Sequence, residues 1–98
     1  MKSYFVYILR CADGTLYCGY TDNIEKRVAT HNSAKGAKYT KPAARRPVIL
    51  LKSLKFATKN DALKCEWWIK NKLTRDEKTS LTERQLKLRF NQYMKKRA

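Results

Sequence analysis

The chain lacks the long apolar segments of membrane and secreted proteins. It contains no apolar run of about 18 residues, so we expect no membrane-spanning helix. Residues 1–4 lead straight into a strand-like run and leave no room for a signal peptide. The hydrophobic fraction of 43% is too high for a disordered chain. The 98 residues therefore predict one small folded domain, or one domain with a tail.

Cysteine is present in an odd number and without Cys-x-x-Cys spacing. Cys11, Cys18 and Cys65 argue against a disulfide framework and against a structural zinc site. A reducing cytoplasm is the simplest compartment for such a chain, and we expect the protein there.

Acidic residues are scarce. Eight Asp and Glu stand against 23 Lys and Arg, which gives a formal net charge of +15. A polyanion is the expected partner, and the charge alone does not choose between DNA and RNA or name a reaction. No strongly amphipathic basic helix with exposed large apolar residues is evident, which disfavours binding to a membrane surface.

The N-terminal part of the chain predicts a β-hairpin. Residues 4–11 and 15–21 are strand-like, and Asp13-Gly14 between them is a turn signal. A two-residue loop puts Tyr7 and Tyr17 on opposite faces of the hairpin, whereas a three-residue loop with a left-handed Gly14 puts them on one face. We expect the three-residue loop, because it leaves the other face consistently apolar.

A helix, a basic loop and a third strand follow. The helix spans residues 22–32, with Asp22 as its N-cap and with Ile24 and Val28 as apolar anchors. The loop spans residues 33–47. The strand spans residues 48–56, and its first four residues are expected to be buried on both faces.

Two more helices complete a β-β-α-β-α-α order. Thr58 caps a helix that runs to about Leu73. Ser80 with Glu83 forms a second capping box, which opens a C-terminal helix that ends in a frayed basic segment. The inward residues of this last helix are Leu86, Phe90 and Tyr93. No internal repeat or domain boundary is evident.

Glu66 lies on the apolar stripe that Ala62, Ile69 and Leu73 form on the residue 58–73 helix. One interpretation is an ion pair with Lys70 one turn later, worth about 0.2–0.5 kcal/mol. The other is a carboxylate at the lip of the core that binds Mg²⁺ or Mn²⁺, since such cations take oxygen ligands and keep most of their waters.

Arg27 and His31 lie one turn apart beside the inward stripe of the residue 22–32 helix. Arg27 either extends along apolar surface to reach water or clamps a phosphate with its planar guanidinium. His31 is either a hydrogen-bonded structural histidine or a proton carrier beside that clamp.

Tyr7 and Tyr17 are ordinary strand residues when each is taken alone, and core packing explains either one. On one face of the hairpin they form a candidate site. A phenol, with a reference pKa near 10, is a poor base unless a nearby cation stabilises its charged form.

In this order, these residues resemble the GIY-YIG nucleases. The first motif of that family matches Phe5-Val6-Tyr7, and the second matches Tyr17-Cys18-Gly19. The family's arginine matches Arg27 and its metal-binding glutamate matches Glu66. The run Lys26-Arg27-Val28-Ala29-Thr30-His31-Asn32 is similar to the branch that includes the structure-specific endonuclease subunit acting on branched DNA. The length and the Gly-Ala-Lys-Tyr-Thr loop are more similar to small stand-alone bacterial members.

The resemblance implies an α/β fold with a small, largely antiparallel three-stranded sheet flanked by helices. It implies a GIY-YIG-like domain over residues 1–78, with the C-terminal helix and basic tail of residues 79–98 packed on it. The implied activity is metal-dependent cleavage of DNA by an endonuclease. The resemblance also implies that cleavage is structure-specific and serves DNA repair, and that Glu66 binds one Mg²⁺ or Mn²⁺. The implied catalytic residues are Tyr7, Tyr17, Arg27, His31 and Glu66.

One departure from the family pattern leaves the function open. Tyr20 stands where the excision-repair members place a lysine, so a cation that tunes Tyr17 must come from elsewhere. A nucleic-acid-binding module with weak or no cleavage is the alternative function. In either case the expected partner is DNA with branched or single-stranded regions, and RNA is the alternative partner. The expected phosphate contacts are Lys35, Lys38, Lys41, Arg45 and Arg46, with Tyr39 stacked on an unpaired base.

Overall fold

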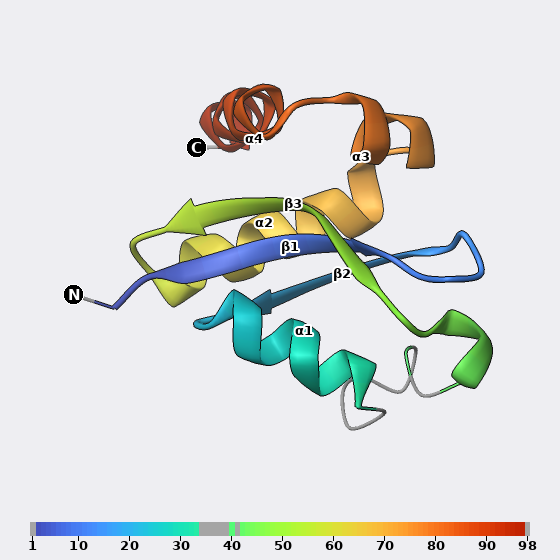
Figure 1. Ribbon diagram of the computed structural model, residues 1–98. Helices are drawn as coiled ribbons and strands as arrows, with labels where there is room; N and C mark the ends of the chain where they lie inside the picture. Colours follow the sequence, from blue (N-terminus) through green and yellow to red (C-terminus); the bar gives the residue numbers. More distant parts are fainter. Residues whose placement is uncertain (1, 34–39, 41, 98) are drawn as a thin grey trace.

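The computed structural model describes residues 2–33, 40 and 42–97. Its first half contains β1 (Tyr4–Arg10), β2 (Leu16–Thr21), α1 (Ile24–Asn32) and the short 3₁₀ helix η2 (Ala43–Arg45). Its second half contains β3 (Ile49–Phe56), α2 (Lys59–Lys72), α3 (Arg75–Ser80) and α4 (Glu83–Arg97) (Figure 1). No helix in these ranges is long and apolar enough to cross a membrane.

The three strands form one antiparallel sheet in the order β2-β1-β3, as the resemblance implied. The β1–β2 connection is the three-residue loop that the sequence favoured. The Cys11 amide donates to the Thr15 carbonyl at 2.8 Å, and Gly14 has a φ of +85°. Tyr7 therefore pairs with Gly19 in the next strand, Leu9 pairs with Tyr17, and the two tyrosines share a face.

The sheet lies between α1 on one face and α2 with α4 on the other (Figure 1), and a hydrophobic cluster lies on each face. On one face α1 covers the sheet, and its residues Ile24 and Val28 pack against a small cluster of Tyr7, Leu9, Cys11 and Val48. On the other face α2 and α4 pack over the larger cluster, which contains Val6, Ile8, Cys18, Leu54, Phe56, Ala62, Cys65, Trp68, Ile69, Leu86 and Phe90. The C-terminal helix thus shares the main core, while the predicted boundary at residue 78 stays a prediction.

The predicted caps are correct at one helix and wrong at two. Thr58 caps α2 as expected. At α1 the cap is Asn23, which accepts from the Lys26 amide at 3.1 Å, while Asp22 forms an exposed ion pair with Lys2. The unpredicted helix α3 opens with a capping box of its own.

The start of α4 differs from the prediction because α3 occupies the residues before it. Ser80 ends α3, and Thr82 instead accepts from the Gln85 amide at 3.1 Å. The basic end predicted to be frayed is helical through Arg97.

The prediction that residues 48–51 are buried on both faces is also wrong. Val48 is buried, but Ile49 and Leu50 are exposed. The register explains the difference: Ile8 of β1 pairs with Lys52 and Leu9 pairs with Leu50, so Leu51 is an extra residue in β3. This bulge lies in an edge strand, where fewer neighbours are available to cover the side chains.

Candidate active site

Tyr7 is the centre of a buried polar cluster on the α1 face of the sheet. Its side chain is only 1% exposed, since it points inward from the central strand β1. The Arg27 side chain donates from Nε to the Tyr7 hydroxyl at 3.3 Å, and His31 Nε2 lies 3.0 Å from the same oxygen. One phenol oxygen therefore joins the two residues that α1 presents one turn apart.

His31 continues this chain of hydrogen bonds. It is fully buried, and its Nδ1 lies 2.8 Å from Thr40 Oγ1, which is also fully buried. Because the Tyr7 oxygen accepts from Arg27, its own proton is available to His31 Nε2. We infer a neutral imidazole that accepts at Nε2 and donates from Nδ1 to Thr40.

The electrostatics agree with this assignment. Burial, and then the Arg27 charge, lower the pKa of His31 below its ordinary value. Burial also raises the pKa of Tyr7 to about 12. Near neutral pH the pair is therefore a neutral phenol and a neutral imidazole, which suits positioning better than proton transfer.

Gly19 leaves the space that the Tyr7 hydroxyl occupies. A Cβ at position 19 would lie 2.5 Å from the Tyr7 oxygen and 2.7 Å from its Cζ. The hydroxyl end of Tyr7 cannot swing aside without breaking its bonds to Arg27 and His31. The glycine of the second motif is thus explained by packing against the tyrosine of the first.

Tyr17 extends the cluster toward the surface. Its half-buried ring lies with its centroid 5.1 Å from that of His31 and 6.3 Å from that of Tyr7. Lys70 of α2 places its Nζ 5.9 Å from the Tyr17 ring centroid. Since β2 is an edge strand, a lysine from the opposite sheet face reaches this ring around the edge of the sheet.

Glu66 is linked to this cluster through Lys70. Its carboxylate Oε2 accepts from Lys70 Nζ at 3.3 Å, and its side chain is 20% exposed. The ion pair of the first interpretation is therefore present. It also places the carboxylate on the α2 side of the β2 edge, where Lys70 contacts both Glu66 and the Tyr17 ring.

A metal at this site would rest on one protein carboxylate. The described ranges contain no group of three or more His, Cys, Asp or Glu residues that could hold a metal ion. The donor chemistry of Glu66 still fits Mg²⁺ or Mn²⁺, because such ions bind through one carboxylate, a substrate phosphate and retained waters.

Most of the predicted phosphate contacts lie outside the described residues: Lys35, Lys38, Tyr39 and Lys41. Arg45 is described, and its Nε forms a 3.1 Å ion pair with Asp13. Arg46 is half-buried directly after η2. The structure thus gives Arg45 an intramolecular role at the hairpin turn, and its contact with nucleic acid stays a prediction.

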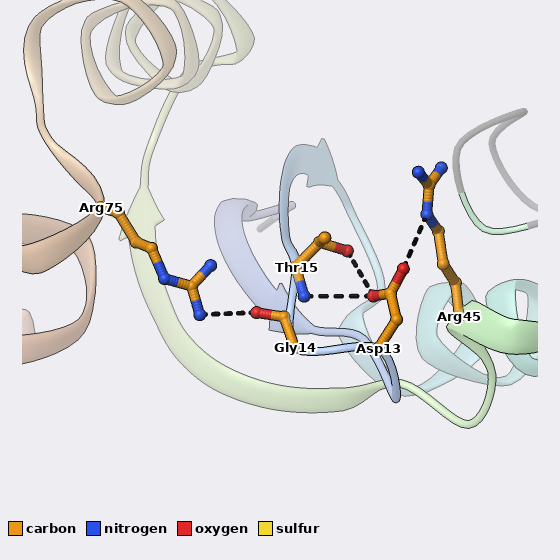
Figure 2. Close-up of polar contacts among 5 residues, drawn as sticks. All are labelled: Asp13, Gly14, Thr15, Arg45 and Arg75. Atoms are coloured by element: carbon orange, nitrogen blue, oxygen red, sulfur yellow. Dashed lines mark hydrogen bonds and ion pairs between the residues drawn. The ribbon is translucent and has the colours of Figure 1, made fainter.

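The hairpin turn is held from two sides (Figure 2). Asp13 accepts from the Thr15 amide and hydroxyl and from Arg45, while Arg75 at the start of α3 donates to the Gly14 carbonyl. The bonds from Thr15, and then Arg45, lower the pKa of Asp13. These contacts fix the loop that sets the shared face of Tyr7 and Tyr17.

The family model described as "GIY-YIG catalytic domain" matches residues 3–80. The chain belongs to the GIY-YIG family. Among its relatives, UPF0213 protein YsiG of Lactococcus lactis subsp. lactis is 59% identical over 95 residues, which are 96% of this chain and 89% of YsiG. A UPF0213 protein of Lacticaseibacillus paracasei is 48% identical over 88 residues, which are 90% of this chain and 97% of that protein.

A solved structure shares the GIY-YIG fold of this chain. The solution NMR structure of protein EF2693 from E. faecalis is 48% identical, covers 90% of this chain and 86% of its own, and superimposes with a TM-score of 0.56. The family points to nuclease chemistry and to a nucleic-acid substrate.

Three residues in or beside the cluster around Tyr7 and Tyr17 are not predicted from the sequence. Gly19 enters the sequence pattern only as part of a motif, although a glycine beside a strand tyrosine signals a close approach. Thr40 lies in the segment that is predicted to bind DNA. The sequence predicts Lys70 only as a partner of Glu66, and no local pattern connects it with Tyr17.

Proposed function

We propose that this GIY-YIG domain is a metal-dependent DNA endonuclease. The observation that carries the proposal is the buried Tyr7 hydroxyl, which bonds to His31 and anchors Arg27. The Arg27 guanidinium also interacts with the half-buried phenol of Tyr17. A fixed cation next to an ionisable hydroxyl suits hydrolysis of a phosphodiester bond, which needs charge stabilisation and a base.

In this proposal Tyr7 and His31 are positioning residues. Both are buried. Tyr7 bonds to Arg27 and His31, and His31 bonds to Thr40, so the pair fixes the position of Arg27. Arg27 is half-buried, so part of its side chain reaches solvent while Nε is anchored on Tyr7. Its guanidinium would bind the scissile phosphate and neutralise the charge that grows on it.

Tyr17 would take the proton of the attacking water. It is the tyrosine of the pair that reaches the surface. The ammonium of Lys70 supplies the nearby cation that the sequence lacks at position 20.

Glu66 would hold one Mg²⁺ or Mn²⁺. When bound, such an ion polarises the phosphate and stabilises the leaving oxygen. When Glu66 binds the metal ion, its ion pair with Lys70 would weaken or break. Lys70 would then remain available to Tyr17. The family implies products with a 5′-phosphate.

Cleavage of linear, flapped and junction DNA, with Mg²⁺ or Mn²⁺, tests the proposal. Glu66→Ala and Tyr17→Phe should bind DNA about as well as wild type and cleave it ~10²-fold more slowly or worse. Arg27→Ala should lose both cleavage and some binding, because a phosphate clamp acts in the ground state and in the transition state. Glu25→Ala, at an exposed position of α1, is the matched control for loss of one negative charge.

A nucleic-acid-binding module without efficient cleavage is the second candidate. The observation that favours it is the ion pair of Glu66 with Lys70, which occupies the carboxylate that a metal needs. Absence of metal-dependent cleavage by wild type on every substrate would refute the endonuclease and favour this module. Normal cleavage by Glu66→Ala would refute the role of Glu66 as the metal ligand.

A further inference from the structure

A groove lies between α2 and α4, on the sheet face opposite α1. Its volume is about 490 Å³, and its lining consists of Lys64, Trp67, Tyr93, Met94 and Arg97. None of these residues belongs to the cluster around Tyr7 and Tyr17. The volume is within the range of about 300–1,000 Å³ that small-molecule sites occupy.

The two neighbouring tryptophans of α2 have opposite environments. Trp68 is 4% exposed and packs against Phe90 and Tyr93 in the main core. Trp67 is 48% exposed, and Lys72 places its Nζ 5.7 Å from the Trp67 ring centroid. Packing in the core therefore explains a tryptophan at position 68, whereas the indole of Trp67 is exposed in the groove.

The polar side of the groove is cationic. Arg97 is positioned by its own helix, because its guanidinium donates to the Tyr93 hydroxyl at 2.8 Å and lies 5.5 Å from that ring's centroid. Lys64 lines the groove from α2. The lining contains two positive side chains and no carboxylate, which suits an anionic ligand.

We propose that the groove between α2 and α4 binds an unpaired nucleotide of a single strand. Its base stacks on Trp67 and its phosphate lies between Lys64 and Arg97. An aromatic face beside cations is how proteins bind unpaired bases without reading their sequence. The inference deepens the proposed function and rests on it for the choice of nucleic acid as the anion.

The position of the groove indicates the kind of substrate. Glu66 and Trp67 are consecutive on α2, so their side chains point about 100° apart around the helix axis. An unpaired tail that leaves the proposed cleavage site can pass around α2 and reach Trp67. The groove thus favours substrates in which a single-stranded tail adjoins the cleaved strand.

Binding of oligothymidine of about 12 nucleotides, in buffer with EDTA, tests the groove without any cleavage. Base stacking should quench Trp67 fluorescence, while buried Trp68 should contribute a constant signal. Trp67→Ala should abolish the quenching and weaken binding by about 5- to 150-fold, as measured by anisotropy of a labelled strand. Trp67→Phe removes the reporter but keeps an aromatic face, so its affinity should stay closer to wild type than that of Trp67→Ala.

Leu88→Ala is the matched control, since Leu88 is 55% exposed on α4 and does not line the groove. Its affinity should equal that of wild type, and thermal melts should show that both alanine variants fold. Binding of wild type without quenching, or equal weakening by Trp67→Ala and Leu88→Ala, would overturn the proposal. Oligouridine in a parallel arm distinguishes RNA from DNA as the source of the tail.

The two proposals fail in different ways. Wild type that binds with quenching but does not cleave any DNA in Mg²⁺ or Mn²⁺ refutes the endonuclease and retains the groove. Wild type that cleaves tailed DNA without quenching refutes the groove and retains the endonuclease. Glu66→Ala should bind and quench as wild type does, because Glu66 does not line the groove.

Discussion

Replacing Tyr7 with phenylalanine removes one oxygen atom from the centre of the domain. The ring stays, so packing in the small cluster on the α1 face is preserved. The lost hydroxyl is bonded to His31 and to Arg27. The change therefore isolates the hydrogen-bonded chain from the hydrophobic core.

The expected loss follows from the burial of His31. Without the Tyr7 hydroxyl, Nε2 of a fully buried imidazole loses its donor, and an unsatisfied buried group costs about 1–3 kcal/mol. For a domain of this size each kcal/mol lowers the melting temperature by about 4–8 °C. Arg27 also loses its anchor, so we expect slower cleavage together with lower stability.

Urea unfolding followed by tryptophan fluorescence measures this free energy of unfolding. Tyr20→Phe is the matched control, because Tyr20 is half-buried at the edge of the main core. Its stability should change by no more than about 0.5 kcal/mol. If Tyr7→Phe is as stable as wild type, the chain Arg27–Tyr7–His31 does not support the fold and the reasoning is wrong.

Three further predictions follow from the site and its surroundings. Gly19→Ala should lose about 1–3 kcal/mol of stability by crowding the Tyr7 hydroxyl, and an unchanged melting temperature would contradict the close approach. The pKa of folded His31 lies below its unfolded value near 6.5, so the unfolded chain binds protons first and stability should fall as pH drops below about 6.5. This loss should be smaller in His31→Gln, as measured by urea unfolding at several pH values, and an identical pH dependence would exclude His31 as the cause. Replacing Lys35, Lys38 and Lys41 with alanine should reduce the log–log salt slope of DNA affinity by roughly 0.9 for each lost phosphate contact, and an unchanged slope would exclude this loop as a contact.

Local sequence patterns predict the structure correctly where neighbouring residues determine it. The Asp13-Gly14 turn and the alternation of apolar residues determine the hairpin register, and Thr58 was a correct cap. At α1 both Asp22 and Asn23 are residue types that cap helices well, and the structure uses Asn23. Local preference alone cannot resolve such a choice.

The missed parts of the site depend on contacts between distant segments. Thr40 contacts His31 from nine residues further along the chain, and Lys70 reaches Tyr17 around the edge of the sheet. The exposure of Ile49 and Leu50 depends on the bulge in β3, which no composition signal marks. In each case a tertiary arrangement decides the environment of the side chain.

The contacts at the hairpin turn also bear on the order in which a growing chain can complete its fold. The turn emerges from the ribosome early, but Arg45 lies 32 residues after Asp13 and Arg75 lies 61 residues after Gly14. A nascent chain therefore holds the hairpin without either contact that fixes its loop. Early in synthesis the register is held by the local bonds from Thr15 to Asp13 and from Cys11 to Thr15. The two arginines reinforce it against a slip of one residue only when most of the chain has been made.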